Sequence, residues 1–172
     1  FSAAENQTSI GTVTATDADS GDSVTFTVSG SELAMTSAGV LSFASAPDYE
    51  TKASHTATVT ASDGTNTTTQ AITVNVTNVN DNSPVFTSSA TFSAAENQTS
   101  IGTVTATDAD SSDSITFTVS GSELAMTSAG VLSFASAPDY ETKTSYAATV
   151  TASDGTNTTT QAITVNVTNV ND

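Results

Sequence analysis

Apolar and polar residues alternate strictly in three stretches of the first half of the chain, residues 23–29, 56–61 and 72–77. Such alternation places successive side chains on opposite faces of an extended chain, so each stretch predicts a half-buried β-strand. In the first stretch Val24, Phe26 and Val28 share one face. The inward sets of the other two are Ala57, Val59 and Ala61, and Ile72, Val74 and Val76. The outward positions are mostly Thr, which favours strands.

Weaker strands are expected around residues 10–15, 33–36 and 40–43, and over 86–94. Together they give about seven short strands per repeat, separated by Gly, Asn, Asp and Ser turns, with no 3.6-residue periodicity. This pattern predicts an all-β protein of two tandem seven-stranded Greek-key β-sandwiches with immunoglobulin-like architecture. A coiled coil or helical solenoid does not fit the period, and the regular alternation disfavours disorder.

The chain contains one unit twice, because residues 1–81 recur as 92–172. The two copies differ at five pairs of positions: Gly21/Ser112, Val24/Ile115, Ala53/Thr144, His55/Tyr146 and Thr56/Ala147. We therefore expect a first domain over 1–81 and a second over 82–172, with an interdomain linker at 78–84. Residues 82–91 have no counterpart before Phe1, so the first domain is expected to lack its lead-in strand and the chain to come from a longer array.

The net charge of the chain narrows the choice of binding partner, since the sequence has 18 Asp and Glu residues but only two Lys and no Arg. This balance argues against nucleic acid and against direct membrane contact, and it favours a cation. The sequence has no Cys, which excludes disulfides and suits a bacterial secreted protein better than a disulfide-rich ectodomain. No apolar run is long enough to span a membrane.

Each repeat carries nine of the acids, and they fall in predicted turns and strand ends rather than in the long strands. A single Asp there is best explained as a solvated turn residue, because Asp favours turns for local hydrogen-bonding reasons. Clusters of like charge without counter-ions, however, raise the energy of the compact state. A hard divalent cation with six to eight oxygen ligands would neutralise them.

Other chemistries fit less well. Residues 17–21 resemble the start of an EF-hand loop, but its twelfth position, which needs a bidentate Glu, is Val28. His55, the one histidine, is replaced by Tyr146 in the second repeat, and no Gly-x-Ser-x-Gly elbow is present. The pair Asp48 and Glu50 could hydrolyse glycosides in principle, yet its duplication favours a metal site. We therefore predict no catalytic residues and no enzyme.

Five ordered motifs, each present in both repeats or at the boundary between them, resemble those of the cadherin repeat family, in a bacterial cadherin-like version. They are Glu5-Asn6, Asp17-Ala18-Asp19, Asp48-Tyr49-Glu50, Ala61-Ser62-Asp63-Gly64 and the linker Asn78-Val79-Asn80-Asp81-Asn82-Ser83-Pro84. The second copies of the first four begin at Glu96, Asp108, Asp139 and Ala152. The resemblance implies calcium sites between consecutive domains, with two to three Ca²⁺ ions at the interdomain junction.

Carried over residue by residue, the resemblance implies ligands from both repeats and from the linker. They are Glu5, Asp48, Glu50, Asn78, Val79, Asn80, Asp81, Asn82, Asp108, Asp110 and Asp154. Asn78 stands where the family has its first linker acid, so a charge is lost there, and the ion that shares it is expected to bind loosely or to be lost. Asp113 is a further candidate ligand or a turn residue.

The outer ends are expected to hold incomplete half-sites with weak occupancy. Their residues are Asp17, Asp19 and Asp63 at one end and Glu96, Asp139, Glu141, Asn169, Asn171 and Asp172 at the other. Tyr49 and Tyr140 are expected to pack beneath the loops that carry them. The predicted function is calcium-dependent rigidity of an extracellular, adhesive surface or secreted protein made of neighbouring repeats. The alternative is a calcium-supported module that binds polysaccharide or a second copy of itself.

Overall fold

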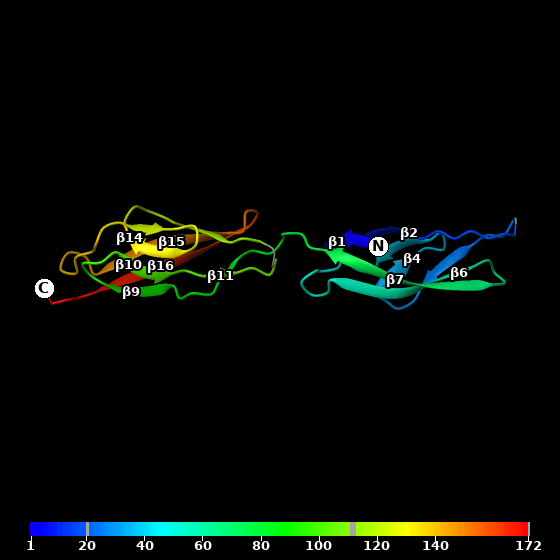
Figure 1. The fold of residues 1–172 in the computed structure, drawn as a ribbon, viewed down its shortest axis with the longest axis horizontal. Helices are drawn as coiled ribbons and strands as arrows, with labels where there is room; N and C mark the ends of the chain where they lie inside the picture. Colours follow the sequence, from blue (N-terminus) through cyan, green and yellow to red (C-terminus); the bar gives the residue numbers. More distant parts are fainter. Residues whose placement is uncertain (20, 111–112, 172) are drawn as a thin grey trace. The chain divides into compact units, whose positions relative to one another are not determined.

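The computed structural model describes residues 1–19, 21–110 and 113–171, which form two compact units, Phe1–Val79 and Asn80–Asp172. The described residues form strands, turns and loops but no helix, which confirms the predicted all-β class (Figure 1). Accordingly, this part of the chain offers no helix that is long and apolar enough to cross a membrane. The boundary between the units follows Val79 and lies inside the predicted linker.

The first unit is a sandwich of a four-stranded and a three-stranded sheet. Its strands are β1 (Ser2–Ala4), β2 (Ser9–Thr12), β3 (Thr25–Val28), β4 (Leu33–Met35), β5 (Val40–Phe43), β6 (Ser54–Ser62) and β7 (Thr67–Thr77). The larger sheet has the order β1-β7-β6-β3 and the smaller the order β2-β5-β4. Strand β1 runs parallel to β7, whereas the other pairs are antiparallel.

The core lies between these sheets and contains the residues that the alternation assigned to it. Phe26, Val59 and Val74 are buried, with Val74 fully inaccessible to solvent. Leu41 and Phe43 of β5 face them from the smaller sheet. Because apolar side chains from both inner faces interdigitate in such a sandwich, burial of this cluster is the main force that holds the two sheets together.

The second unit repeats this plan and adds one small ladder. Its strands are β8 (Val85–Phe86), β9 (Thr91–Ala95), β10 (Ser100–Thr103), β11 (Ala106–Thr107), β12 (Thr116–Val119), β13 (Leu124–Met126), β14 (Val131–Phe134), β15 (Ser145–Ser153) and β16 (Thr158–Thr168). The sheets have the orders β12-β15-β16-β9 and β10-β14-β13, and β8 pairs with β11.

The prediction of one strand over residues 86–94 is wrong, because the chain divides there into β8 and β9. Strand β8 pairs antiparallel with β11, and β9 pairs parallel with β16. Between them the Ser89 hydroxyl accepts a hydrogen bond from the Thr91 amide at 3.0 Å, and the Ala90 carbonyl accepts one from the Thr164 amide. The segment thus changes partner strand in the turn between β8 and β9, and no alternation pattern records such a change.

Residues 1–19 and 21–79 of the first unit form no ladder equivalent to that of β8 and β11. Residues 15–16, the counterparts of β11, are not in a strand, and β2 ends at Thr12 rather than at residue 15 as predicted. The reason lies in the pairing: in the second unit this short strand exists only through its bonds to β8. Two residues cannot hold an extended ladder without a partner strand.

Strand β7 begins five residues earlier than expected, at Thr67. Residues 67–71 are exposed on both faces, so they show no apolar alternation. They are nevertheless extended, because each pairs with a residue of β6, from Thr67 with Ser62 to Ala71 with Thr58. Cross-strand hydrogen bonding therefore lengthens the β6–β7 hairpin beyond the region that hydrophobic periodicity can detect.

Candidate metal centre

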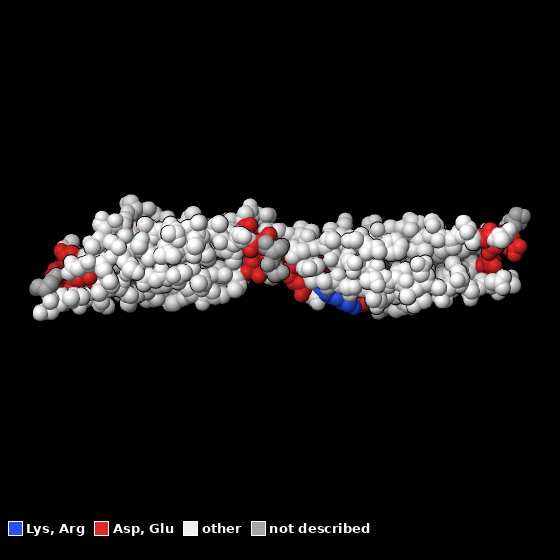
Figure 2. Space-filling model, viewed as in Figure 1, with Lys and Arg blue, Asp and Glu red and all other residues white. Residues whose placement is uncertain are grey.

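Within each unit the acidic side chains lie at the ends of the sandwich, and the faces of the sheets that are in view carry few of them (Figure 2). This follows from the sequence, since the acids precede or follow strands rather than occupy them. Loops from several strands meet at each end of a sandwich. Carboxylates that are distant in the sequence are therefore close in space.

Glu5 is buried to 3% exposure at the end of β1, and its carboxylate joins three segments of the first unit. Oε2 accepts a hydrogen bond from the Tyr49 amide at 2.9 Å, and Oε1 accepts one from the Val79 amide at 2.7 Å. Two charge-assisted bonds compensate part of the unfavourable burial of this side chain. The predicted ligand Glu5 thus also fixes the start of the linker.

The second unit repeats this arrangement at Glu96, which is 4% exposed. Its carboxylate accepts hydrogen bonds from the amides of Tyr140 at 2.8 Å and Val170 at 2.7 Å. The repetition shows that this structure is encoded within one repeat.

The residue after each buried glutamate has a left-handed backbone, with φ of 61° at Asn6 and 63° at Asn97. Asn adopts this conformation more readily than most other residues that carry a side chain. The Asn6 amide donates to the Pro47 carbonyl at 3.0 Å, and the Asn97 amide donates to the Pro138 carbonyl. The Glu-Asn pair therefore turns the chain sharply and keeps the carboxylate at the end of the sandwich.

Asp48 begins the loop that carries the next predicted acids. Its Oδ1 accepts a hydrogen bond from the Thr51 amide at 3.0 Å, and its Oδ2 accepts one from the Thr51 hydroxyl at 2.9 Å. These bonds to Thr51 favour the ionised form and hold the pKa of Asp48 below its usual value. Asp139 is bound in the same way by Thr142, and its pKa is also lowered.

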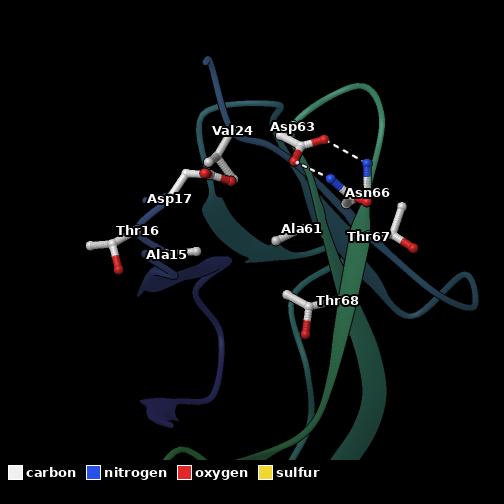
Figure 3. Close-up of a pocket in the computed structure, with 9 residues that line it drawn as sticks. All are labelled: Ala15, Thr16, Asp17, Val24, Ala61, Asp63, Asn66, Thr67 and Thr68. Carbon is white, nitrogen blue, oxygen red and sulfur yellow. Dashed lines mark hydrogen bonds between the residues drawn. The ribbon is translucent and has the colours of Figure 1, made fainter. Parts of the chain in front are cut away.

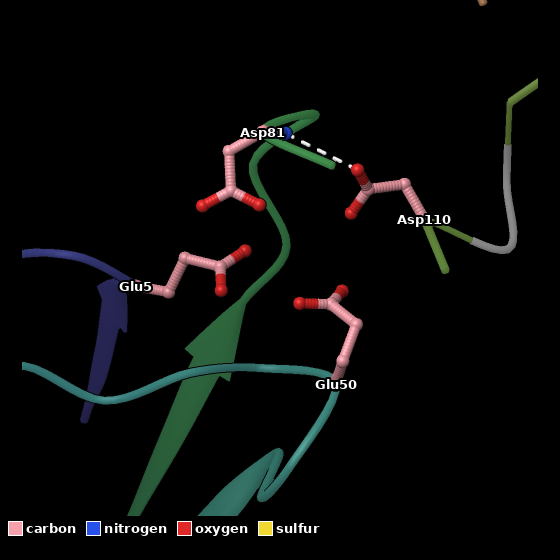
Figure 4. A group of neighbouring side chains, drawn as sticks. All are labelled: Glu5, Glu50, Asp81 and Asp110. Carbon is pink, nitrogen blue, oxygen red and sulfur yellow. Dashed lines mark hydrogen bonds between the residues drawn. The ribbon is translucent and has the colours of Figure 1, made fainter. Parts of the chain in front are cut away.

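Glu50 lies in the same loop and offers a carboxylate oxygen within 4.8 Å of one on Glu5; both side chains are drawn in Figure 4. Asn78 donates from Nδ2 to Oε1 of Glu50 at 3.1 Å. In the second unit Glu96, Asp139 and Glu141 bring oxygens within 4.8 Å of one another, and Asn169 donates to Glu141 at 2.7 Å. Each unit thus gathers predicted ligands at the end of the sandwich that carries its Glu-Asn pair.

The opposite end of the second unit holds Asp110, which is fully buried. Its Oδ2 accepts hydrogen bonds from the amides of Asp81 at 3.1 Å and Asn82 at 2.9 Å, and Figure 4 shows the first of these. Oxygens of Asp81 and Asp110 also lie within 4.8 Å of each other. The second half of the linker is thereby attached to the second unit.

Asp108 and Asp113 supply the test of whether a cation fits this end. Asp108 Oδ2 and Asp113 Oδ2 are buried, and no donor among residues 1–19, 21–110 and 113–171 bonds to either. An ionised oxygen that is removed from water without a donor is strongly unfavourable. The oxygen-only donor set, with several carboxylates and nearby carbonyls, is the kind that Ca²⁺ prefers. The residues present therefore fit a calcium ion.

Asp154 supplies the remaining predicted ligand of the second unit. Burial raises its pKa, but hydrogen bonds to its carboxylate, first from the Asn157 and Thr156 amides, lower it, and the net pKa lies below the usual value. Both amides donate to Oδ1 at 2.6 Å. In the first unit Asp63 is held equivalently, and hydrogen bonds from the Asn66 and Thr65 amides lower its pKa.

Asn157, which was not among the predicted ligands, organises the linker side of this site. Its Nδ2 donates to Asn80 Oδ1 and to the Asn82 carbonyl, both at 2.7 Å. These two bonds orient two predicted ligands toward one side chain. The repeated Asp-Gly-Thr-Asn sequence, present at both 63–66 and 154–157, was the available signal.

The predicted half-site residues that remain are Asp17 and Asp19 of the first unit and Asn171 and Asp172 of the second. Asp17 and Asp19 are exposed and share a group with Asp22, in which oxygens lie within 4.8 Å of one another. Asp22 was not among the predicted ligands, although it is the counterpart of Asp113. Asn171 is exposed, and Asp172 lies outside the described residues.

Two pairs of aromatic residues that the sequence singled out pack within their units. Tyr49 and Tyr140 are partly buried against the cores of their units, as predicted. His55 packs edge-on against Phe43 with ring centroids 5.2 Å apart, and Tyr146 packs likewise against Phe134 at 5.0 Å. The histidine position is therefore one of aromatic packing.

No family model and no curated protein matches this sequence. Solved structures do match it. Mouse cadherin-23 EC22-24 aligns with a TM-score of 0.80 and 27% identity over 99% of this chain and 63% of that chain. Human protocadherin-24 EC1-2 aligns with a TM-score of 0.79 and 22% identity over 98% and 91% of the two chains. Drosophila N-cadherin EC1-4 aligns at 0.73 and 24% identity, over 97% of this chain and 45% of that one.

Proposed function

We propose, from the premise that both units are cadherin-like domains, that the chain binds two to three Ca²⁺ ions at the junction around residues 78–84. Bound calcium holds the two domains in one relative orientation. The chain then acts as a rigid segment of an extracellular, adhesive surface or secreted protein. Bacterial origin, which the cysteine-free composition suggested, stays a prediction.

The observation that carries this proposal is the pair of buried oxygens on Asp108 and Asp113 that no described donor satisfies. If these positions only had to form hydrogen bonds with neighbouring groups, Asn or Ser could do so without a buried charge. Carboxylates there are explained by a cation that replaces the lost hydration. Because the chain has only two Lys and no Arg, its own side chains supply little positive charge.

Charge balance is compatible with the proposed number of ions. The charged ligands on the two sides and in the linker are Glu5, Asp48, Glu50, Asp81, Asp108, Asp110 and Asp154. These seven negative charges exceed the six positive charges of three Ca²⁺ ions by one, so charge balance permits three ions. The neutral amide of Asn78 makes the ion that shares it the weakest of the three, since fewer charged ligands lower calcium affinity.

The hydrogen bonds of the linker support the proposal that calcium fixes the relative orientation of the two domains. Val79 is bonded to Glu5 of the first unit, and Asp81 is bonded to Asp110 of the second. Val79 and Asp81 are two residues apart in the sequence, a span of at most about 7 Å. Ligands from both units and from this short connection would bind the same ions. Calcium would then select one arrangement and stabilise the folded chain by mass action.

Calorimetric titration of Ca²⁺ into the chain, compared with its Asp108→Asn variant, tests the proposal. Asp17→Asn is the matched control, because it changes the same motif in the first repeat, which in the 172-residue chain used for the titration is not joined to a linker on that side. We expect Asp108→Asn to weaken the tightest binding phase by about tenfold or more, as the loss of a charged ligand implies. We expect Asp17→Asn to leave that phase unchanged. Equal isotherms for wild type and Asp108→Asn would overturn the calcium site.

Small-angle scattering with calcium and with chelator tests the mechanical part separately. Calcium should narrow the distribution of interdomain distances in the wild-type chain and should not do so in Asp108→Asn. If the distribution is the same with and without calcium while calorimetry shows binding, the domains bind calcium but are not rigidified by it.

A further inference from the structure

The side-chain amide of Asn157 lies among oxygen atoms of the predicted calcium ligands. Its nitrogen, Nδ2, is 2.7 Å from Asn80 Oδ1, 2.7 Å from the Asn82 carbonyl oxygen and 3.4 Å from Asp154 Oδ2. The carbonyl oxygen of Asn80 is 3.5 Å away. All four residues belong to the second unit. One NH₂ group therefore faces four oxygens, which come from three predicted ligand residues.

These neighbours determine which end of the Asn157 amide faces them. A backbone carbonyl accepts hydrogen bonds and cannot donate them, and the same holds for an ionised carboxylate. The Asn82 carbonyl and the Asp154 carboxylate therefore require the NH₂ end, since the amide oxygen would be repelled. An NH₂ group has only two protons to share among the four oxygens. Asn157 thus satisfies this group of oxygens in part, and it brings no positive charge to compensate that of Asp154.

A calcium ion would bind the same oxygens more strongly than the amide does. Ca²⁺ takes six to eight oxygen ligands at about 2.3–2.6 Å and carries two positive charges. The N–H groups of Asn157 and the ion would compete for the same lone pairs. A positively polarised N–H group beside a divalent cation is also unfavourable. The present position of the Asn157 side chain is therefore poorly compatible with an ion bound to Asn80, Asn82 and Asp154.

Other bonds hold the linker and the turn when this side chain moves. The Asp110 carboxylate accepts hydrogen bonds from the Asp81 and Asn82 amides at 3.1 and 2.9 Å. The backbone amide of Asn157 donates to Asp154 Oδ1 at 2.6 Å, which keeps the turn closed. Asn157 is only partly buried, so its side chain has access to solvent. It can therefore leave the oxygens without releasing the linker from the second unit.

We propose that Asn157 is an internal competitor of calcium. In the calcium-free chain its amide holds the oxygens of Asn80, Asn82 and Asp154 together, and calcium binding displaces it toward solvent. This inference rests on the proposed calcium-binding function and adds a residue that regulates its affinity. Because these hydrogen bonds exist only in the calcium-free form, they stabilise that form and weaken calcium binding by the same factor.

A role of Asn157 in positioning ligands for the ion predicts the opposite effect. If its hydrogen bonds persisted in the calcium-bound chain, they would keep Asn80 and Asn82 in the binding geometry, and their loss would weaken binding. If calcium must break them, their loss strengthens binding. The direction in which calcium affinity changes when the side chain is removed therefore distinguishes the two roles.

Asn66 is the counterpart of Asn157 in the first unit and provides the matched control. Its backbone amide donates to Asp63 Oδ1 at 2.6 Å and its Nδ2 donates to Asp63 Oδ2 at 3.2 Å, as Figure 3 shows. In the 172-residue chain used for the experiment, this side of the first unit is not joined to a linker. Asn66→Ala therefore removes the same side chain from the same turn without changing a contact to Asn80 or Asn82.

Calorimetric titration of calcium into the wild-type, Asn157→Ala and Asn66→Ala chains tests the proposal. We expect Asn157→Ala to bind one calcium ion about tenfold more tightly than wild type, because two hydrogen bonds no longer have to be broken. Asn66→Ala should leave that affinity unchanged. In chelator, Asn157→Ala should lower the melting temperature of the second unit by about 5 °C, since the bonds it loses stabilise the calcium-free form.

A spectroscopic measurement on the wild-type chain needs no stable variant. In NMR spectra the side-chain amide signal of Asn157 should move toward that of solvent-exposed Asn amides when calcium is added, and a signal that calcium leaves unchanged would overturn the competition. Equal or weaker calcium binding by Asn157→Ala, with wild type still binding, would overturn it too and leave the proposed calcium site intact. If neither chain bound calcium, the proposed function would fail, and this inference with it.

Discussion

The Glu5 carboxylate accepts a hydrogen bond from the Val79 amide at 2.7 Å, although the two residues are 74 positions apart. The same carboxylate binds the Tyr49 amide through its other oxygen. One buried side chain therefore joins the first strand, the Asp-Tyr-Glu loop and the linker. This residue has a structural role in the first unit that is independent of any ion.

Glu5→Gln should destabilise the first unit even in chelator. Gln keeps one acceptor oxygen but presents an NH₂ group to the second amide donor, which is left without a partner. The expected loss is about 1–3 kcal/mol of unfolding free energy. Urea unfolding followed by circular dichroism measures it, and hydrogen exchange should show faster exchange at the Val79 amide.

Glu96→Gln is the matched variant in the second unit, where the partners are the Tyr140 and Val170 amides. It should destabilise the second unit by a similar amount and leave exchange at Val79 unchanged. A Glu5→Gln chain as stable as wild type, with Val79 still protected, would contradict the structural role of this carboxylate.

Stability should depend on pH through Asp63, whose pKa is lowered by the Asn66 and Thr65 amides. A carboxyl group with a folded-state pKa below its unfolded value binds fewer protons when folded. Its stabilising effect is therefore complete above the unfolded pKa, about 3.9, and is lost as pH falls through the lower folded pKa. Asp63→Ala should thus destabilise the chain clearly at pH 6 and much less at pH 2.

Thermal unfolding of wild type and Asp63→Ala at both pH values, in chelator, gives the comparison. The difference between the two proteins is the informative quantity, because protonation of the other 17 acids changes both melting temperatures together. A difference that grows as pH falls would show that the hydrogen bonds to Asp63 do not favour its ionised form.

The substitutions His55→Tyr and Tyr146→His should change the unfolding free energies of their units in opposite directions. His55 is 8% exposed, and its Nε2 has no hydrogen-bond partner among the described residues, although Nδ1 lies 3.3 Å from Glu32. Tyr146 has Lys143 Nζ at 4.3 Å from its ring centroid, and Lys143 also pairs with Glu123.

His55→Tyr should therefore stabilise the first unit by about 0.5–1 kcal/mol through a cation–π contact with Lys52. Tyr146→His should destabilise the second unit by a similar amount. Chemical denaturation of both variants checks these signs. The same sign for both changes would indicate that the neighbouring differences, Thr56/Ala147 and Ala53/Thr144, determine the preference at this site.

The sandwich could be predicted from the sequence because its core positions obey a period of two. Val74 and Phe26 are buried where the alternation places them. The break between β8 and β9 could not be predicted, because it depends on hydrogen bonds of Ser89 and Ala90 that carry no apolar signal. The extension of β7 to Thr67 could not be predicted for the same reason, since only its pairing with β6 keeps that exposed segment in an extended conformation.

At the candidate metal centre, motif spacing identified the acids but not their supporting contacts. Asn157 was missed because an Asn in a Thr-rich turn is ordinary in sequence, whereas its bonds to Asn80 and Asn82 depend on the folded linker. Likewise, the buried state of Glu5 follows from how β1 and the linker meet.

Asn78→Asp should have opposite effects in the two calcium states. Asn78 donates to Glu50 at 3.1 Å, so an aspartate there loses a hydrogen bond and adds like-charge repulsion in chelator. The expected destabilisation without calcium is about 1 kcal/mol or more. With calcium the added carboxylate becomes a ligand, and the weakest ion of the proposed set should bind about tenfold more tightly. Thermal unfolding in chelator and calorimetry with calcium measure the two effects.

Asn169→Asp is the matched control, because Asn169 makes the same bond to Glu141 at 2.7 Å in a repeat whose linker has no following domain in this chain. It should destabilise the second unit in chelator without a comparable gain in calcium affinity, since an incomplete half-site lacks the ligands of a second domain. If both variants gained the same calcium affinity, the ligands of a single repeat would be enough to produce the gain. The junction would then be unnecessary for binding, and calcium could not fix the orientation of the domains.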